Sequence, residues 1–121
     1  MSNVKDLAPH IYRQRLLIEG IYDREVTADT VREFFDVLLA ELDMTAAGAP
    51  IVNVSDGLGK PENQGIEAFI PLIESGVALY TWESSSFLSL IIYTCKAYDD
   101  PRAIEITRDF FELSQFECKP F

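Results

Sequence analysis

The amino-acid sequence predicts an α+β fold, a two-layer sandwich in which an antiparallel sheet carries two helices on one face. Two segments, one early and one late in the chain, have the apolar period of an amphipathic helix. Several short extended segments lie between them, divided by turn residues. The 121 residues are 48% hydrophobic and 25% charged, which suits one globular domain spanning residues 1–121.

The first helix has the strongest pattern in the chain. Its apolar residues recur at helical spacing and form one stripe: Val31, Phe34, Phe35, Leu38, Leu39 and Leu42. Thr30 followed three residues later by Glu33 resembles a capping box. Thr27 and Asp29 are the alternatives for the cap. We expect the helix to end near 47–48, where a glycine suits a left-handed cap.

The extended segments alternate with turn signals. Strands are predicted at 10–20, 49–55, 66–73, 77–82 and 87–95. Pro71 in the third of these implies an edge strand or a bulge. Residues 74–76 break the chain before the fourth strand. The segment 87–95 is apolar on both faces, which predicts a central strand.

The second helix is predicted to start at Asp100, as N-cap, with Pro101 at the first helical position. Its buried stripe is expected to consist of Ala103, Ile106, Phe110 and Leu113. The tail 116–121 is predicted to add a short final strand. Because the strands carry apolar residues on both sides, the face without helices also needs a cover, and a second copy of the chain is the simplest one. We therefore expect a homodimer.

Composition excludes several classes of function. Ten basic and 20 acidic residues give a formal net charge of −10, which argues against binding to nucleic acid or to anionic membranes. Two cysteines, Cys95 and Cys118, do not make a disulfide framework, so a reducing, cytoplasmic location is expected. The single histidine, His10, excludes every metal site that needs two histidines, and no metal is expected.

One pair of chemically active residues is predicted to lie side by side. If the hairpin turn centres on Ser85, Ser75 lies opposite Cys95, and directly opposite residues have Cβ atoms about 4.5–5.5 Å apart. A hydroxyl and a thiol would then be neighbours on one face. Small residues are common in strands, so packing alone also accounts for the pair.

The segment 74–82 resembles the prokaryotic S-adenosylmethionine decarboxylases. That family reads E-S-H-x-x-x-H-T-W, where this chain has E-S-G-V-A-L-Y-T-W. The family's T-C and D-P pairs follow in register, at Thr94-Cys95 and Asp100-Pro101. Weaker similarity covers 10–23 and 47–49, so the resemblance extends over most of the chain.

The resemblance implies a specific chemistry. In that family the chain cleaves itself at the bond matching Glu74-Ser75, and the serine becomes a pyruvoyl group. Its ketone forms a Schiff base with the substrate amine and acts as an electron sink while CO₂ leaves. The cysteine matching Cys95 then acts as general acid. An acidic protein would also attract cationic S-adenosylmethionine.

The chain departs from the family pattern at three positions. Gly76 and Tyr80 stand where the family has histidines, and Glu67 replaces a serine. A tyrosine hydroxyl ionises near pH 10 and an imidazole near 6.5, so tyrosine is the weaker base. Glu67 is the alternative base. Strict alternation puts Tyr80 on the face opposite Ser75, so a bend near the cleavage site is needed.

Two hypotheses follow. The first is a pyruvoyl-dependent decarboxylase of polyamine metabolism, acting on S-adenosylmethionine, ornithine or arginine. Ser75 would supply the pyruvoyl group and Cys95 the proton, while Glu67, Tyr80 and Trp82 would line the substrate pocket. The second is a relative that does not cleave itself and serves as a binding or regulatory subunit, pairing with an active paralogue.

Overall fold

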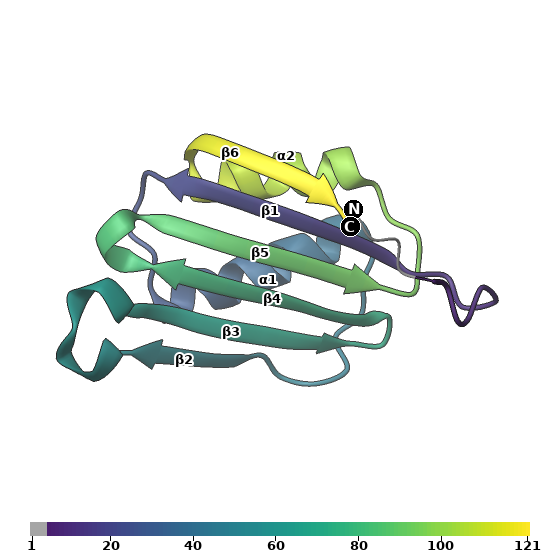
Figure 1. Cartoon of the computed structure of the whole chain (residues 1–121), viewed down its shortest axis with the longest axis horizontal. Coiled ribbons are helices and arrows are strands. Elements are labelled where there is room, and N and C mark those ends of the chain that lie inside the picture. Colours follow the sequence, from purple (N-terminus) through teal and green to yellow (C-terminus); the bar gives the residue numbers. More distant parts are fainter. Residues whose placement is uncertain (1–4) are drawn as a thin grey trace.

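A computed structural model describes residues 5–121, which form a six-stranded antiparallel sheet with two helices behind it (Figure 1). The elements are β1 (Gln14–Tyr22), α1 (Ala28–Leu42), β2 (Ile51–Ser55), β3 (Gly65–Leu72), β4 (Ser75–Trp82), β5 (Phe87–Thr94), α2 (Asp100–Phe111) and β6 (Leu113–Pro120). The strand order is β2-β3-β4-β5-β1-β6, and every neighbouring pair is antiparallel. The predicted fold class is confirmed.

The strand that the sequence predicts to be central is central in the structure. β5 lies between β4 and β1, as its apolar character on both faces predicts. The edge position implied by Pro71 is wrong, because β3 lies between β2 and β4. Proline is tolerated there because β2 pairs with β3 only as far as Ile51 opposite Phe69, and Pro71 lies beyond that point. Its carbonyl accepts a hydrogen bond from the Ala47 amide instead.

Helix α1 is capped by one of the alternative residues, Thr27, and ends before the predicted position. Thr27 is the N-cap, and its hydroxyl accepts a hydrogen bond from the Thr30 amide at 3.2 Å. The predicted end near 47–48 is wrong, because Asp43 adopts the left-handed conformation and closes the helix after Leu42. The chain that follows runs beside the turn between β3 and β4, where Ala46 forms an isolated bridge with Leu72.

The ends of helix α2 also differ from the predicted ends by one or two residues. Asp99, and not Asp100, is the N-cap, and its carboxylate accepts from the Arg102 amide. The helix ends at Phe111, so Phe111 is buried where the sequence pattern points to Phe110, which is only half-buried. Leu113 already belongs to β6, and that strand begins three residues before the predicted 116–121.

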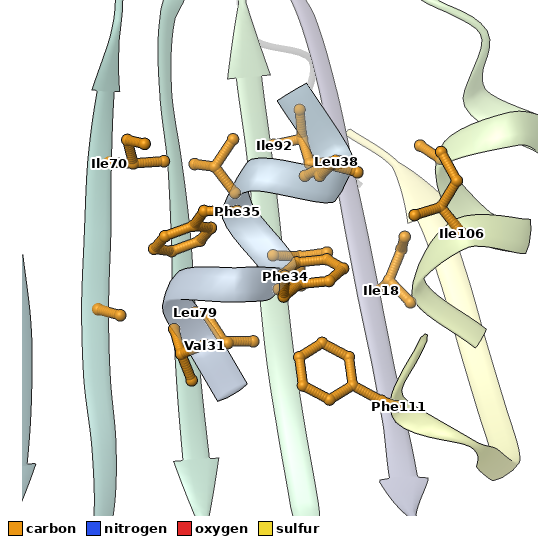
Figure 2. Close-up of a cluster of buried hydrophobic side chains, with 14 of the residues drawn as sticks. Ile18, Val31, Phe34, Phe35, Leu38, Ile70, Leu79, Ile92, Ile106 and Phe111 are labelled. Carbon is orange, nitrogen blue, oxygen red and sulfur yellow. The ribbon is translucent and has the colours of Figure 1, made fainter. Parts of the chain in front are cut away.

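The hydrophobic core lies between the helices and one face of the sheet (Figure 2). Phe34 of α1 is fully buried at its centre, and its ring centroid lies 4.6 Å from that of Phe111 of α2. Beneath them the strands contribute fully buried residues such as Ile18 and Ile92. Both helices lie on this side, which leaves the opposite face of the sheet without helices. In residues 5–121 neither helix is long and apolar enough to cross a membrane.

Candidate active site

The turn between β3 and β4 places a strained residue at Ser75. Leu72 pairs with Ser75 and closes a loop of two residues, Ile73 and Glu74. Such loops normally need a positive φ within the turn, but neither turn residue has one. The positive φ falls on Ser75 instead, at 139°, a region that is almost reserved for glycine. A serine held there stores roughly 1–3 kcal/mol of backbone strain.

The two residues before this serine, Ile73 and Glu74, are held by three hydrogen bonds. The Glu74 carboxylate accepts a hydrogen bond from the Thr45 amide at 3.0 Å. The neighbouring Ile73 amide donates to the Thr45 carbonyl at 2.9 Å. On the other side, the Glu74 carbonyl accepts from the Cys95 amide at 2.7 Å. The Glu74–Ser75 peptide is therefore fixed between the segment that follows α1 and the end of β5.

The predicted pairing of Ser75 with Cys95 is wrong by one residue. Ser75 lies opposite Thr94, because a four-residue loop, 83–86, separates the pair Trp82 and Phe87. Ser86 takes a left-handed conformation that closes this loop. Cys95 comes directly after Thr94, and its side chain is exposed and free of any disulfide. The backbone amide of Cys95, which the sequence analysis did not consider, is the group that contacts Glu74.

Ser75 opens onto a shallow groove of about 300 Å³ on the helix-free face. The other lining residues are apolar or aromatic: Phe69, Gly76, Ala78, Ile91 and Tyr93. A Cβ atom at Gly76 would lie 2.6 Å from the Phe69 ring, so the ring can cover the backbone only because this residue is glycine. The sequence analysis missed Phe69, Ile91 and Tyr93. The signal that finds them is the alternation of side chains once the register is known.

The other predicted site residues lie on the same face but farther along the sheet. Glu67 and Tyr80 are paired across β3 and β4, and the Trp82 ring packs against Phe87 with 5.4 Å between centroids. Tyr80 is five residues from Ser75, or roughly 16 Å along an extended strand. The structure therefore brings Glu67 and Tyr80 together but does not bring either to the Ser75 of the same chain. The bend that the sequence analysis required is the positive φ of Ser75.

The helix-free face is organised in rows that run across the strands. The carboxylate row consists of Asn53, Glu67, Tyr80, Ser89, Glu19 and Glu117. The apolar row beside it consists of Phe69, Ala78, Ile91 and Leu17. The groove row comes next, nearest to Ser75, and consists of Pro71, Gly76, Tyr93 and Arg15. Polar and apolar chemistry thus alternate along this face.

Two hydrogen bonds fix the carboxylate row. The Ser89 hydroxyl donates to the Glu19 carboxylate at 2.9 Å, and the Asn53 amide donates to Glu67 at 3.2 Å. Within residues 5–121 no cluster of three or more histidine, cysteine or acidic side chains is arranged to hold a metal ion. The row is therefore a strip of negative charge on an otherwise partly apolar surface.

The fold and this site together define a class of α+β protein in which helices cover one face of an antiparallel sheet and a strained serine opens onto the other. The sequence profile of S-adenosylmethionine decarboxylase matches residues 21–121. The chain belongs to the S-adenosylmethionine decarboxylase family, as the resemblance at 74–82 indicates.

The known proteins that are similar to the chain include an arginine decarboxylase proenzyme and an adenosylmethionine decarboxylase. A curated protein, the arginine decarboxylase proenzyme of Aeropyrum pernix, is 32% identical over 75 residues, which is 62% of this chain and 52% of the relative. The match thus spans about half the length of that relative. The crystal structure of the adenosylmethionine decarboxylase from Aquifex aeolicus superposes with a TM-score of 0.68, covering 92% of this chain and 89% of the other at 16% identity. This second similarity shows the fold.

Proposed function

We propose that the chain is a pyruvoyl-dependent decarboxylase that matures by cleaving itself between Glu74 and Ser75. The observation that carries the proposal is the positive φ of Ser75 directly after a carbonyl that accepts the Cys95 amide. Attack of the Ser75 Oγ on the Glu74 carbonyl carbon would convert the amide to an ester and place negative charge on the carbonyl oxygen. The Cys95 amide at 2.7 Å would stabilise that charge, and the strain at Ser75 favours leaving the amide.

The remaining steps balance with water alone. Elimination breaks the bond between Cβ and oxygen and leaves Glu74 with a free carboxylate. Water then replaces the former serine nitrogen, which departs as ammonia, and residue 75 becomes the pyruvoyl group. The apolar groove beside Ser75 fits a pyruvoyl group, because none of the residues that line the groove has a basic side chain that could react with the ketone. When present, the group supplies an electron sink for loss of CO₂.

The chain's own side chains then have separate tasks. We assign to the Cys95 thiol the proton that the product carbon receives. The groove holds the apolar part of the substrate, and the carboxylate row attracts a distal cation. This arrangement supports a cationic amino acid as substrate. We propose arginine as the first candidate, with ornithine and S-adenosylmethionine as the alternatives.

The distance between Ser75 and Tyr80 supports a dimeric site. A second copy packed on the helix-free face, reversed in strand direction, would place its Tyr80 and Glu67 near the first copy's Ser75. This assembly would also cover the apolar row. We therefore propose a homodimer in which each site uses Ser75 and Cys95 from one copy and Tyr80 and Glu67 from the other.

The decisive experiment is the intact mass of the purified protein under denaturing conditions. We expect two fragments, 1–74 and 75–121, with the second lacking its α-amine, and a single full-length species for Ser75→Ala. Release of CO₂ from arginine, ornithine and S-adenosylmethionine would then identify the substrate. An uncleaved wild-type chain would favour the second candidate, a regulatory subunit, for which the replacements Tyr80 and Glu67 argue.

A further inference from the structure

We infer that Lys96 is a positioning residue for self-cleavage, because it holds the turn after β5 in which the Cys95 amide reaches the Glu74 carbonyl. The inference rests on the proposed function and names the side chain that orients the donor to the carbonyl oxygen. Lys96 follows Cys95 directly in the sequence. It acts through the backbone of its neighbour and not by contact with the reacting atoms.

The Lys96 side chain is anchored on the C-terminal end of α1. Its Nζ donates a hydrogen bond to the Asp43 carbonyl at 2.6 Å and lies 3.5 Å from the Asp43 carboxylate. Asp43 is the left-handed residue that closes α1, so this carbonyl lies at the negative end of the helix dipole. The last carbonyls of a helix lack partners within the helix, and a lysine ammonium satisfies them well. The contact therefore ties the turn after β5 to a rigid element.

A second hydrogen bond fixes the same turn from inside the fold. The Thr94 hydroxyl donates to the Lys96 carbonyl at 2.6 Å, and Thr94 is fully buried. This bond spans Cys95, which lies beyond Thr94, the last paired residue of β5. The pairing of the strands therefore does not orient the Cys95 amide. Its direction depends on the residues on either side of it, Thr94 inside and Lys96 outside.

One short segment, 43–45, holds both sides of the bond that is cleaved. At one end, the Asp43 carbonyl accepts the Lys96 ammonium. At the other end, the Thr45 amide donates to the Glu74 carboxylate at 3.0 Å, and the Thr45 carbonyl accepts from the Ile73 amide at 2.9 Å. The donor and the acceptor of the critical hydrogen bond are thus positioned by the same segment. Loss of the Lys96 contact releases the donor while the acceptor stays in place.

The position of the Cys95 amide matters because charge develops on the oxygen that it contacts. In the first step the Ser75 Oγ bonds to the Glu74 carbonyl carbon, the bond from that carbon to the Ser75 nitrogen breaks, and the hydroxyl proton ends on the released amine. Between these events the carbonyl oxygen is negative. Donors stabilise such an oxygen at about 2.7–3.1 Å. The Cys95 amide lies at 2.7 Å, and a displacement of about 1 Å can remove much of the rate.

The rate of self-cleavage tests the inference directly. We expect Lys96→Met to slow the conversion of the full-length chain to fragments 1–74 and 75–121 by about ten-fold or more, because the Cys95 amide is no longer held. Lys96→Arg keeps a cationic donor and should cleave within about three-fold of the wild-type rate. Lys60→Met, in the loop between β2 and β3, removes the same charge elsewhere and should cleave like wild type. Cell-free synthesis, stopped and then followed by intact mass over time, gives each rate.

Hydrogen exchange of the Cys95 amide gives a readout that does not depend on cleavage. Ser75→Ala keeps the chain intact, so NMR can follow its amides one by one. In this background we expect Lys96→Met to raise the exchange rate of the Cys95 amide by about ten-fold or more, and Lys96→Arg to leave that amide protected. The Ile92 amide, within the central strand β5, should exchange at the same rate in all three proteins. A general loss of stability would raise exchange at both amides.

The two readouts separate this inference from the proposed function. A Lys96→Met chain that cleaves at the wild-type rate, or in which the Cys95 amide stays protected, would overturn the inference alone. Equal gains in exchange at Cys95 and Ile92 would also overturn it, because Lys96 would then stabilise the whole fold. A wild-type chain that never cleaves would contradict the proposed function, even where Lys96→Met releases the Cys95 amide and the anchoring of the turn stands.

Discussion

The two faces of the sheet are built from the same strands, yet they differ in what they leave exposed. On the covered face, β1 buries Leu16 and Ile18 almost completely, at 1% and 0% exposed. On the helix-free face, Phe69 and Tyr93 are 42% and 39% exposed, and the carboxylate row lies beside the apolar row. The covered face therefore accounts for the stability of the fold, and the other face is the one to which we assign the proposed chemistry and assembly.

The largest effect is expected from the centre of the covered face. Phe34→Ala removes a fully buried ring that packs against Phe35, Phe110 and Phe111, and should lower the free energy of unfolding by about 3–5 kcal/mol. The matched variant Phe69→Ala, on the free face, should lower it by about 1 kcal/mol or less. Urea denaturation measures both. Equal losses would contradict the division between the faces.

The second effect concerns the strain at Ser75. Ser75→Ala keeps a Cβ atom at a φ of 139°, whereas Ser75→Gly removes it, and neither variant can cleave itself. We expect the glycine variant to be more stable than the alanine variant by about 1–3 kcal/mol. Thermal and urea unfolding of the two uncleaved proteins provide the comparison. An alanine variant of equal or greater stability would show that the turn holds no strain.

A smaller effect is expected at the carboxylate before the serine. In the Ser75→Ala background, Glu74→Ala removes the acceptor for the Thr45 amide, which should lower the free energy of unfolding by about 1 kcal/mol. Glu74→Gln keeps an acceptor oxygen at the same position and should retain most of that stability. Urea midpoints distinguish them. The contact has no role in stability if both variants unfold at the same midpoint.

The smallest effect is expected at Tyr98, near the start of α2. Its hydroxyl is buried without a hydrogen-bond partner among residues 5–121, so Tyr98→Phe should change stability at pH 7 by about 1 kcal/mol or less, and upward. Burial, with the nearby Asp100 carboxylate, raises the pKa of Tyr98 well above its ordinary value of 10.0.

That shift gives the pH dependence its sign. Above pH 10 the unfolded chain loses the Tyr98 proton while the folded chain retains it, so the free energy of unfolding falls as pH rises. Tyr98→Phe should flatten this decline between pH 9 and pH 11, as followed by urea titrations at each pH. A decline of the same slope in both proteins would assign it to other groups.

Sequence patterns predicted the covered face better than the free one. The stripe from Val31 to Leu42 and the central strand β5 follow from periodicity, because burial on one side imposes a regular spacing. The ends of elements depended on single residues in left-handed conformations. Asp43 ends α1 and Ser86 closes the loop before β5, and neither is a glycine, the residue type that most clearly predicts a left-handed conformation.

The candidate site depended on register, which local patterns do not determine. Moving the centre of one turn by half a residue changed the partner of Ser75 from Cys95 to Thr94. The motif identified Ser75 and Glu74, but Phe69 and Tyr93 come from other strands and enter the groove only through pairing. The contact between the Cys95 amide and the Glu74 carbonyl involves backbone atoms, so no side-chain pattern could reveal it.

The strand order determines how the two fragments produced by cleavage would be held together. Segment 1–74 supplies β1, β2 and β3, and segment 75–121 supplies β4, β5 and β6, yet β1 lies between β5 and β6. A cut at Glu74–Ser75 would leave two interlaced polypeptides that cannot separate without dismantling the sheet. Before the cut, folding is unimolecular. Afterwards, recovery from denaturant would require two chains to meet, so maturation would be a one-way step that the uncut chain must complete by folding first.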